Sequence, residues 1–448
     1  MGENKQMKRL LVWFALIALA CAGAVSASTY VGYSNAFGID NTKGSTRPAP
    51  PAAVGVSPYD NGAPYNLVRT ELHAHAICDR VPGTSRPLGS DISSETLAQR
   101  YWDAGYRGLA QTNHGNLSGG ALGSGAPSII WLPRSAELSL DGTNYVHVLA
   151  IGTDTTDITA LEGNSRSEGE IQSIETRVAN TKAHGGLALI AHPDSRPYAI
   201  NANNLNKVID DAAPNAVGVY TPGNNSEGMW NAALKSGRRI WGYAEEDYHD
   251  QMNSRNIGQA WVAVPGYESD PWTSVRSELA GGNYYIYWMT DGKWDYASDN
   301  QPPRLKVTVD NSGQYPVITA SMQDWSDAPF APQKIEFLRA DGRALSGVTG
   351  SGSTYSYACK GWEQFVRVRV HHKVRSGVAF TACSQPIRAN PQDAATGALA
   401  RVQSTSPELR LRYLSDEERP ATMPSAGYIG FAFDVTTDSG TVPSGATL

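Results

Sequence analysis

The 448-residue sequence has little charge and no long basic block after its first ten residues. Charged residues make up 18 % of the chain, and the formal net charge is −6. Proteins that bind nucleic acids usually carry a basic surface, so we expect no nucleic-acid partner. No P-loop lysine follows Gly119-Gly120, and no Ser-His-Asp elbow is present. The apolar content of 41 % suffices for a large core in two or three domains.

Long hydrophobic runs are also missing, apart from one at the start of the chain. Basic residues precede an apolar run from Leu10 to about Val25, which falls short of the ~18 residues of a membrane span. This pattern predicts a signal peptide cleaved after Ala27, and hence a periplasmic or extracellular protein without a membrane span. Residues 18–21 also resemble a lipoprotein cleavage box, so a lipid anchor at Cys21 is a second, weaker alternative.

Cysteines are few. Besides Cys21, the chain has Cys78, Cys359 and Cys383. An oxidising compartment makes Cys359 and Cys383 candidates for a disulfide. Cys78 follows closely after His75, so it is either a buried free thiol, which we favour, or a metal ligand.

Composition changes divide the chain into five segments. These are a signal peptide (1–27), a Gly/Pro/Ser-rich linker (28–64), a catalytic domain (65–300), a β-rich accessory domain (301–392) and a C-terminal extension (393–448).

Strand and helix patterns alternate between residues 65 and 292, which favours a parallel sheet or barrel with helices outside. The expected strands cover 65–70, 108–112, 134–140, 147–152, 187–191, 216–220 and 239–244, and a strand–helix–strand unit covers 259–288. The expected helices cover 91–105, 168–184, 203–212 and 226–235.

Helical patterns vanish beyond residue 300. Segments 304–309, 334–338 and 364–370 alternate like half-exposed strands between Gly- and Ser-rich turns. They predict a small antiparallel β-sandwich-like domain. Residues 408–413 and 428–435 are two further strand candidates.

Histidines cluster where strands are expected to end. His73 and His75 stand at i and i+2 at the end of the first strand, so their side chains point the same way. His114, His192 and His249 also follow strands. In a barrel of parallel strands these ends share the face on which active sites form.

Three further residues extend this set. Asp247 joins His249 at i, i+2, whereas Glu137 lies within a strand and His147 begins one, so these last two fit the pattern less well. Imidazoles with carboxylates suit zinc, manganese or iron better than calcium. A carboxylate such as Glu137 can bridge two ions that hold a hydroxide between them.

The same residues carry a family resemblance. The motifs are Glu71-Leu72-His73-Ala74-His75, Thr112-Asn113-His114-Gly115, Ala191-His192-Pro193-Asp194 and Asp247-Tyr248-His249. With them, residues 65–392 resemble the PHP (polymerase and histidinol phosphatase) superfamily of metal-dependent hydrolases. The spacing of Glu137 and His147, and the segments 365–370 and 385–387, resemble its CehA/McbA branch.

The resemblance implies a distorted (β/α)7 barrel with two or three metal ions at its rim. His73, His75, Glu137 and Asp247 would bind one ion. Glu137, His147 and His192 would bind a second, with Glu137 bridging. His114 and His249 would bind a third.

The chain departs from the family pattern at two places. Asn113 replaces the usual Asp, and Cys78-Asp79-Arg80 replaces the usual Ser-Asp-Gly, with Asp79 a possible substitute ligand. Arg196, close after His192, is a candidate for binding an anionic group of a small-molecule substrate or for a surface salt bridge.

The sequence therefore predicts an exported hydrolase in which a metal-bound hydroxide cleaves a phosphoester, or a carboxylester or carbamate. Glu137, Asp247, His249 and Arg196 are its candidate catalytic residues. The alternative is a non-catalytic secreted protein that uses metal only for stability or binds through its β-rich domain.

Overall fold

The computed structural model describes most of residues 66–389 and two later strands. The described residues are 57–59, 66–76, 92–139, 145–163, 168–250, 257–266, 269, 271–296, 301–313, 315–324, 328–360, 363–389, 408–413 and 431–436. The predicted signal peptide, Cys21, nearly all of the linker, Cys78 and Asp79 lie outside them.

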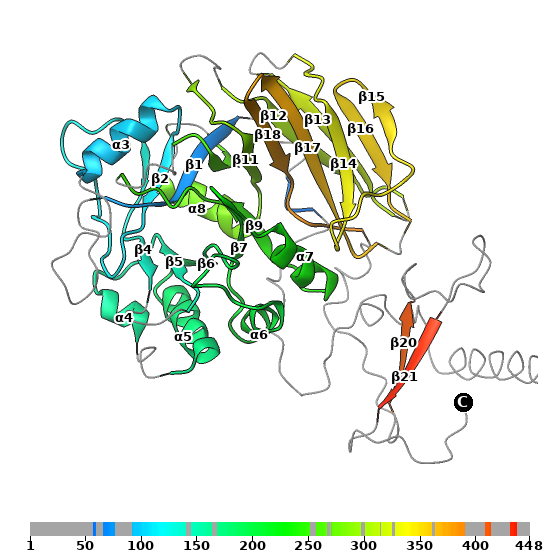
Figure 1. Ribbon diagram of the computed structural model, residues 1–448, viewed down its shortest axis with the longest axis horizontal. Helices are drawn as coiled ribbons and strands as arrows, with labels where there is room; N and C mark the ends of the chain where they lie inside the picture. Colours follow the sequence, from blue (N-terminus) through cyan, green and yellow to red (C-terminus); the bar gives the residue numbers. More distant parts are fainter. Residues whose placement is uncertain are drawn as a thin grey trace, which may run out of the picture. The chain divides into compact units, whose positions relative to one another are not determined.

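A nine-stranded mixed sheet runs through the centre of the larger of two compact units, Asp40–Gly397 (Figure 1). Its order is β14 (Lys334–Arg339), β17 (Phe365–Arg375), β18 (Val378–Cys383), β11 (Tyr285–Asp291), β10 (Ala260–Pro265), β1 (Leu67–Ala74), β2 (Gly108–Gln111) and β3 (Ile130–Leu132), with β19 (Ile387–Arg388) beside β17. Only the pairs β1–β2 and β2–β3 are parallel.

A second sheet of six strands carries the other half of the predicted catalytic domain. It contains β4 (Ala136–Leu138), β5 (Val148–Ile151), β6 (Leu187–Ile190), β7 (Ala216–Thr221) and β8 (Asn224–Asn225), with β9 (Trp241–Ala244) beside β7. β5 runs antiparallel to both β4 and β6, so the expectation of parallel strands is wrong there. Only residues 139–147 separate β4 from β5, fewer than the roughly dozen residues that a parallel crossover needs, so these two strands can pair only antiparallel.

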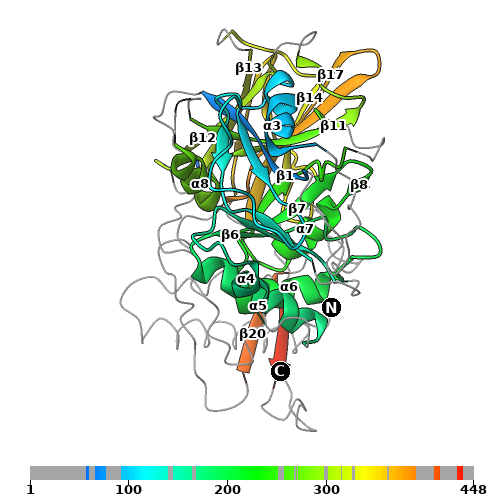
Figure 2. The same ribbon diagram turned by 90° about the vertical axis from the view of Figure 1, so that its left-hand side faces the viewer.

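Helices cover the outer sides of these strands. They are α3 (Ser94–Asp103), α4 (Ile158–Glu162), α5 (Glu170–Ala183), α6 (Ala202–Ala212), α7 (Glu227–Lys235) and α8 (Trp272–Gly281). In Figure 1 and, after a quarter turn, in Figure 2, α4, α5 and α6 lie together on one side of the six-stranded sheet. The apolar spacing that predicted α5 works as expected, because Ile174 and Val178 are fully buried.

The two sheets approach each other where the strands of the predicted barrel end. Isolated parallel bridges pair Ala74 with Tyr248 and His114 with Glu137. At the first bridge, the N–H of His75 donates to the Tyr248 carbonyl at 3.0 Å. Within the described residues, continuous strand pairing does not close into a barrel. The mixed α/β expectation is confirmed, and the closed (β/α)7 barrel is not.

The β-rich region is antiparallel, as expected. β12 (Arg304–Asp310), β13 (Val317–Gln323), β16 (Thr354–Ala358) and β15 (Thr349–Ser351) form a four-stranded sheet. Its inner face packs on β14, β17 and β18 through one shared apolar cluster. Because these three strands belong to the nine-stranded sheet, pairing is continuous across the expected boundary at residue 300. The domain limits stay a prediction.

Two strands belong to the smaller unit. β20 (Glu408–Tyr413) and β21 (Phe431–Thr436) pair antiparallel, close to the expected segments.

The predicted disulfide is wrong. Cys359 and Cys383 are both buried free thiols. Cys383 ends β18 of the nine-stranded sheet, where it pairs with Ile286 and Arg369. Cys359 instead follows β16 of the four-stranded sheet. The two side chains also belong to different apolar clusters, which explains why they do not meet.

None of the helices among the described residues is long and apolar enough to span a membrane.

Candidate metal centre

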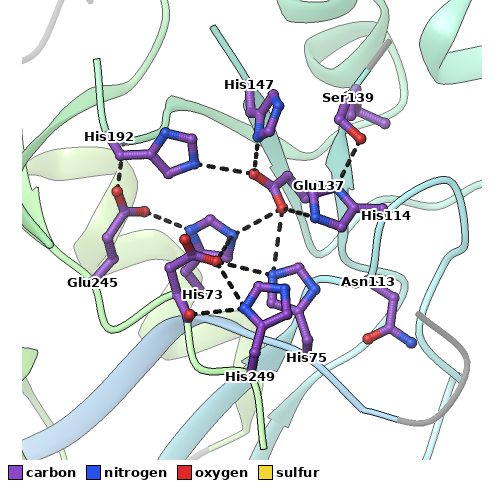
Figure 3. Close-up of polar contacts among 12 residues, drawn as sticks. His73, His75, Asn113, His114, Glu137, Ser139, His147, His192, Glu245 and His249 are labelled. Carbon is purple, nitrogen blue, oxygen red and sulfur yellow. Dashed lines mark hydrogen bonds and ion pairs between the residues drawn. The ribbon is translucent and has the colours of Figure 1, made fainter. Parts of the chain in front are cut away.

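Eight candidate ligands converge near the point where the two sheets meet (Figure 3). His73 lies in β1, Glu137 lies in β4, and the others flank strands. His147 precedes β5 instead of following it. Because β5 is antiparallel to its neighbours, its first residue lies at the same end as the last residues of β4 and β6. The reversal of β5 therefore explains how His147 joins the cluster.

The donor atoms form three overlapping groups, in each of which one atom per residue lies within 4.8 Å of the others. The groups are His73/His75/Glu137/Asp247, His114/Glu137/His147 and His75/His114/His249. The first contains the four residues expected for one ion. His192 joins the cluster through its Nε2, which lies 3.2 Å from Glu137 Oε1.

Glu137 stands at the centre of the cluster. Its Oε2 lies 3.1 Å from Nε2 of His73, 3.4 Å from Nε2 of His75 and 3.1 Å from Nε2 of His114. Its Oε1 contacts His192 and the Nδ1 of His147. The two carboxylate oxygens thus face two different sets of imidazoles, as a bridging carboxylate must.

Asp247 supplies the second carboxylate. Its Oδ1 lies 3.3 Å from Nε2 of His73 and 3.2 Å from Nε2 of His75. His249 Nδ1 lies 3.5 Å from the same oxygen. The backbone φ angles of Asp247 and His192 are 49° and 26°. Such left-handed conformations cost non-glycine residues about 1–3 kcal/mol and are found mainly where function requires them.

The imidazoles are crowded together. The rings of His75 and His249 stack with centroids 3.9 Å apart, and those of His75 and His114 lie 4.9 Å apart. Glu137 Oε2 and His73 Nε2 are buried without a hydrogen bond of acceptable geometry, although they face each other. A cation between them would satisfy both atoms. The cluster can bind metal ions.

The charges of the cluster support this fit. Burial disfavours charge on His73, but Glu137 and Glu245 outweigh it and raise the pKa of His73 to about 10. Burial would raise the pKa of Glu137, but His114, His147 and His73 hold it well below its usual value. Burial lowers the pKa of His147, partly offset by Glu137. Glu137 is therefore a carboxylate and His147 a neutral imidazole at neutral pH.

Among the described residues, neither Asn113, which replaces the usual Asp, nor the predicted substrate-binding Arg196 hydrogen-bonds to a ligand side chain. The side chain of Asn113 turns away in Figure 3, and its Oδ1 accepts the N–H of Ala76 at 2.9 Å. Asn113 therefore holds the backbone after His75. Arg196 is exposed and makes no hydrogen bond or ion pair with the described ligands. Its role at the substrate stays a prediction.

Sequence reasoning missed the polar residues that support the ligands. Glu245 bonds to His73 Nδ1 at 2.8 Å, and Ser139 bonds to His114 Nδ1 at 2.7 Å. Tyr198 lies on the His147 ring, with centroids 4.4 Å apart. Burial raises the pKa of Glu245, but His73 and His192 outweigh it and lower that pKa. The one available signal was the acidic run of residues 245–247 directly after a strand.

Two further buried glutamates hold the ends of β1 and β9 together. Glu71 Oε1 accepts the N–H of His73 at 2.8 Å and that of Glu246 at 3.0 Å. Glu246 accepts the hydroxyl protons of Tyr101 and Tyr106. These bonds fix the backbone on both sides of the ligands.

Arg177 supports the cluster from α5. It is fully buried, and its guanidinium donates to the carbonyls of Leu138 and Val146, which adjoin Glu137 and His147. Replacing Arg177 by Met leaves these carbonyls without a donor, so we expect a loss on the order of 3 kcal/mol in the free energy of unfolding. Urea unfolding measures this loss. The half-buried Arg276 of α8 provides the control, since Arg276→Met should change stability by less than about 1 kcal/mol.

Comparisons with known proteins add little. The sequence matches no protein-family model and no curated protein sequence. Among solved structures, it is similar to an amidohydrolase from Chromobacterium violaceum with bound sulfate and no metal, at a TM-score of 0.33 and 15 % identity. The match covers 47 % of this chain and 96 % of the other. A protein named as a metal-dependent phosphoesterase from Bifidobacterium adolescentis matches with the same TM-score, identity and coverage of each chain. At this level, the likeness carries no weight in assigning a function.

Proposed function

We propose that the chain is an exported metal-dependent hydrolase of the PHP superfamily, close to its CehA/McbA branch. The observation that carries this proposal is the convergence of six imidazoles and two carboxylates on one buried site, with Glu137 facing both halves. A purely structural metal site needs only four ligands, and this site offers twice as many. Export is proposed from the signal-peptide pattern of residues 1–27.

The arrangement of strands supports the barrel that this family would have. Strand pairing joins β1 to β2, and it joins β4, β5, β6, β7 and β9 in that order. The isolated bridges His114–Glu137 and Ala74–Tyr248 then link these two groups of strands at both ends. We interpret them as a distorted seven-stranded barrel that is held together at the metal end by bridges rather than by full ladders.

The candidate ligands would be distributed among the ions as follows. His73, His75, Glu137 and Asp247 would bind one ion, and Glu137, His147 and His192 a second. His75, His114 and His249 would bind a third. When bound, such ions lower the pKa of a water to about 7 in the zinc case and polarise the bond under attack.

The chain's own residues would orient the substrate and exclude water. The side chains of His114, Asp247 and His147 are 11 %, 9 % and 8 % exposed, whereas those of His73, His75 and Glu137 are at most 1 % exposed, so substrate would enter past the first three. Tyr198 borders this entrance through its contact with His147. Asp247 and His249 would hold protons near His114, since His249 shares a donor group with it, and Arg196 would bind an anionic substrate group.

A reporter screen tests the activity. Purified protein with Zn²⁺, Mn²⁺ or Fe²⁺ is incubated with p-nitrophenyl phosphate, bis-p-nitrophenyl phosphate, p-nitrophenyl acetate and an aryl carbamate. We expect metal-dependent release of nitrophenol or the aryl alcohol from at least one ester class. Phosphate turnover would favour phosphoester hydrolysis, and acetate or carbamate turnover would favour the closer branch. Tight metal binding without any turnover would instead support the non-catalytic alternative.

A further inference from the structure

Glu245 is a fully buried carboxylate that touches two parts of the candidate metal centre at once. Its Oε1 accepts the backbone N–H of His192 at 2.7 Å and the hydroxyl of Thr221 at 3.0 Å. Its Oε2 lies 2.8 Å from Nδ1 of His73 and accepts the hydroxyl of Tyr243 at 2.9 Å. The carboxylate therefore joins a ligand of β1 to the segment that follows β6.

The fold leaves space for this carboxylate. A Cβ added at Gly218 of β7 would lie 3.0 Å from Glu245 Oε1 and 2.9 Å from the His192 nitrogen. Any side chain at Gly218 would push the carboxylate or His192 away. The backbone N–H of Glu245 donates to the carbonyl of Tyr220 at 3.0 Å, which holds Glu245 beside β7, the strand that contains Gly218.

The contacts of Glu245 determine which nitrogen of His73 carries a proton. Because Oε2 is an acceptor, Nδ1 of His73 must be its donor. The other nitrogen, Nε2, then faces Glu137 Oε2 at 3.1 Å and Asp247 Oδ1 at 3.3 Å, inside the four-residue ligand group. In many metal sites a carboxylate behind a histidine fixes the ligating nitrogen in this way.

We propose that Glu245 is a positioning residue that keeps the proton of His73 on Nδ1 and leaves Nε2 free to bind a metal ion. The proposal rests on the proposed metal centre. Glu245 itself is not one of the eight candidate ligands.

The geometry gives this role an unusual signature in the Glu245→Gln variant. The backbone N–H of His192 can only donate, so the amide oxygen of the new Gln must take the Oε1 position. The NH₂ group then faces Nδ1 of His73, which must become an acceptor, so that the one proton of the neutral ring lies on Nε2. Tyr243 accommodates this change, because its hydroxyl can donate to the Ile190 carbonyl at 3.3 Å instead. The isosteric variant should fold and yet turn a protonated Nε2 toward the metal.

Zn²⁺ binding to the full chain tests the proposal. Chelator competition measures the affinity of wild type, Glu245→Gln, Glu245→Ala and the control Glu363→Gln, a buried carboxylate bonded to Tyr357 in the β-rich region. We expect Glu245→Gln to lose about 10–100-fold in affinity for the most tightly bound ion. Glu245→Ala, which leaves the choice of nitrogen free, should lose less, and Glu363→Gln should bind like wild type.

Nitrogen-15 NMR of the Zn²⁺-loaded protein gives a second measurement. In wild type, His73 should show a protonated Nδ1, assigned by its loss in His73→Asn, and in Glu245→Gln with excess Zn²⁺ this signal should be absent. Wild-type affinity in Glu245→Gln, or a larger loss in Glu245→Ala than in Glu245→Gln, would overturn the role. If wild type itself binds no Zn²⁺, the proposed function fails instead, so the two failures are distinguishable.

Discussion

Replacing Glu137 by Gln is expected to lower Zn²⁺ affinity and turnover of the reporter ester by more than about 100-fold each. The amide removes the charge that faces five imidazoles, and its NH₂ group would point a donor at one of the two ion positions. Because Glu137 belongs to both halves of the cluster, a single substitution should empty more than one position. Metal analysis of the purified variant measures this loss directly.

The control for this prediction is Glu363→Gln. This residue is also buried and hydrogen-bonded, but its partners Tyr357 and Lys360 belong to the β-rich region. It should keep the metal content and activity of wild type. Full activity in Glu137→Gln would contradict the assignment of Glu137 as the bridging ligand.

Removing metal is expected to destabilise the protein strongly, and more so at high pH. Zn²⁺ at roughly 1,000 times its Kd stabilises the folded state by about 4 kcal/mol. This corresponds to a shift in Tm on the order of 10 °C between the Zn²⁺-loaded and chelator-treated protein. Thermal unfolding followed by circular dichroism at about pH 6 and about pH 9 measures the difference.

The pH dependence follows from His73. Its pKa rises from 6.5 to about 10 on folding without metal. The stability it contributes is therefore fully present below pH 6.5 and is lost as the pH rises through about 10. A cation must displace the proton on Nε2, so Zn²⁺ affinity rises over the same range. The difference in Tm between the Zn²⁺-loaded and the chelator-treated protein should increase with pH, and it should increase less in His73→Asn. A difference in Tm that stays constant with pH would contradict the raised pKa of His73.

Most strands and helices of the proposed catalytic region were predictable because their local patterns are strong. The helix around Ile174 and the strand that ends at Ala74 lie close to where the sequence places them. The direction of β5 was not predictable from periodicity, which is the same for parallel and antiparallel strands. The length of its connection to β4 was the better signal. The disulfide failed because sequence spacing says nothing about which apolar cluster holds Cys359 and Cys383.

The ligand candidates were recognisable because histidine is rare and recurs here beside strands. The supporting residues were not, because a buried glutamate such as Glu245 or Glu71 has the same sequence appearance as an exposed one. Only the packing shows that Glu245 meets the backbone of His192 and the ring of His73. Arg177 was missed for the same reason, since a helical arginine is usually exposed.

Anomalous X-ray scattering at the zinc absorption edge, from crystals grown with Zn²⁺, tests the metal centre most directly. We predict one anomalous peak among His73, His75, Glu137 and Asp247, and a second beside Glu137 toward His147 and His192. Crystals that contain zinc but show no peak at Glu137, or peaks only at surface histidines such as His371, would contradict the account.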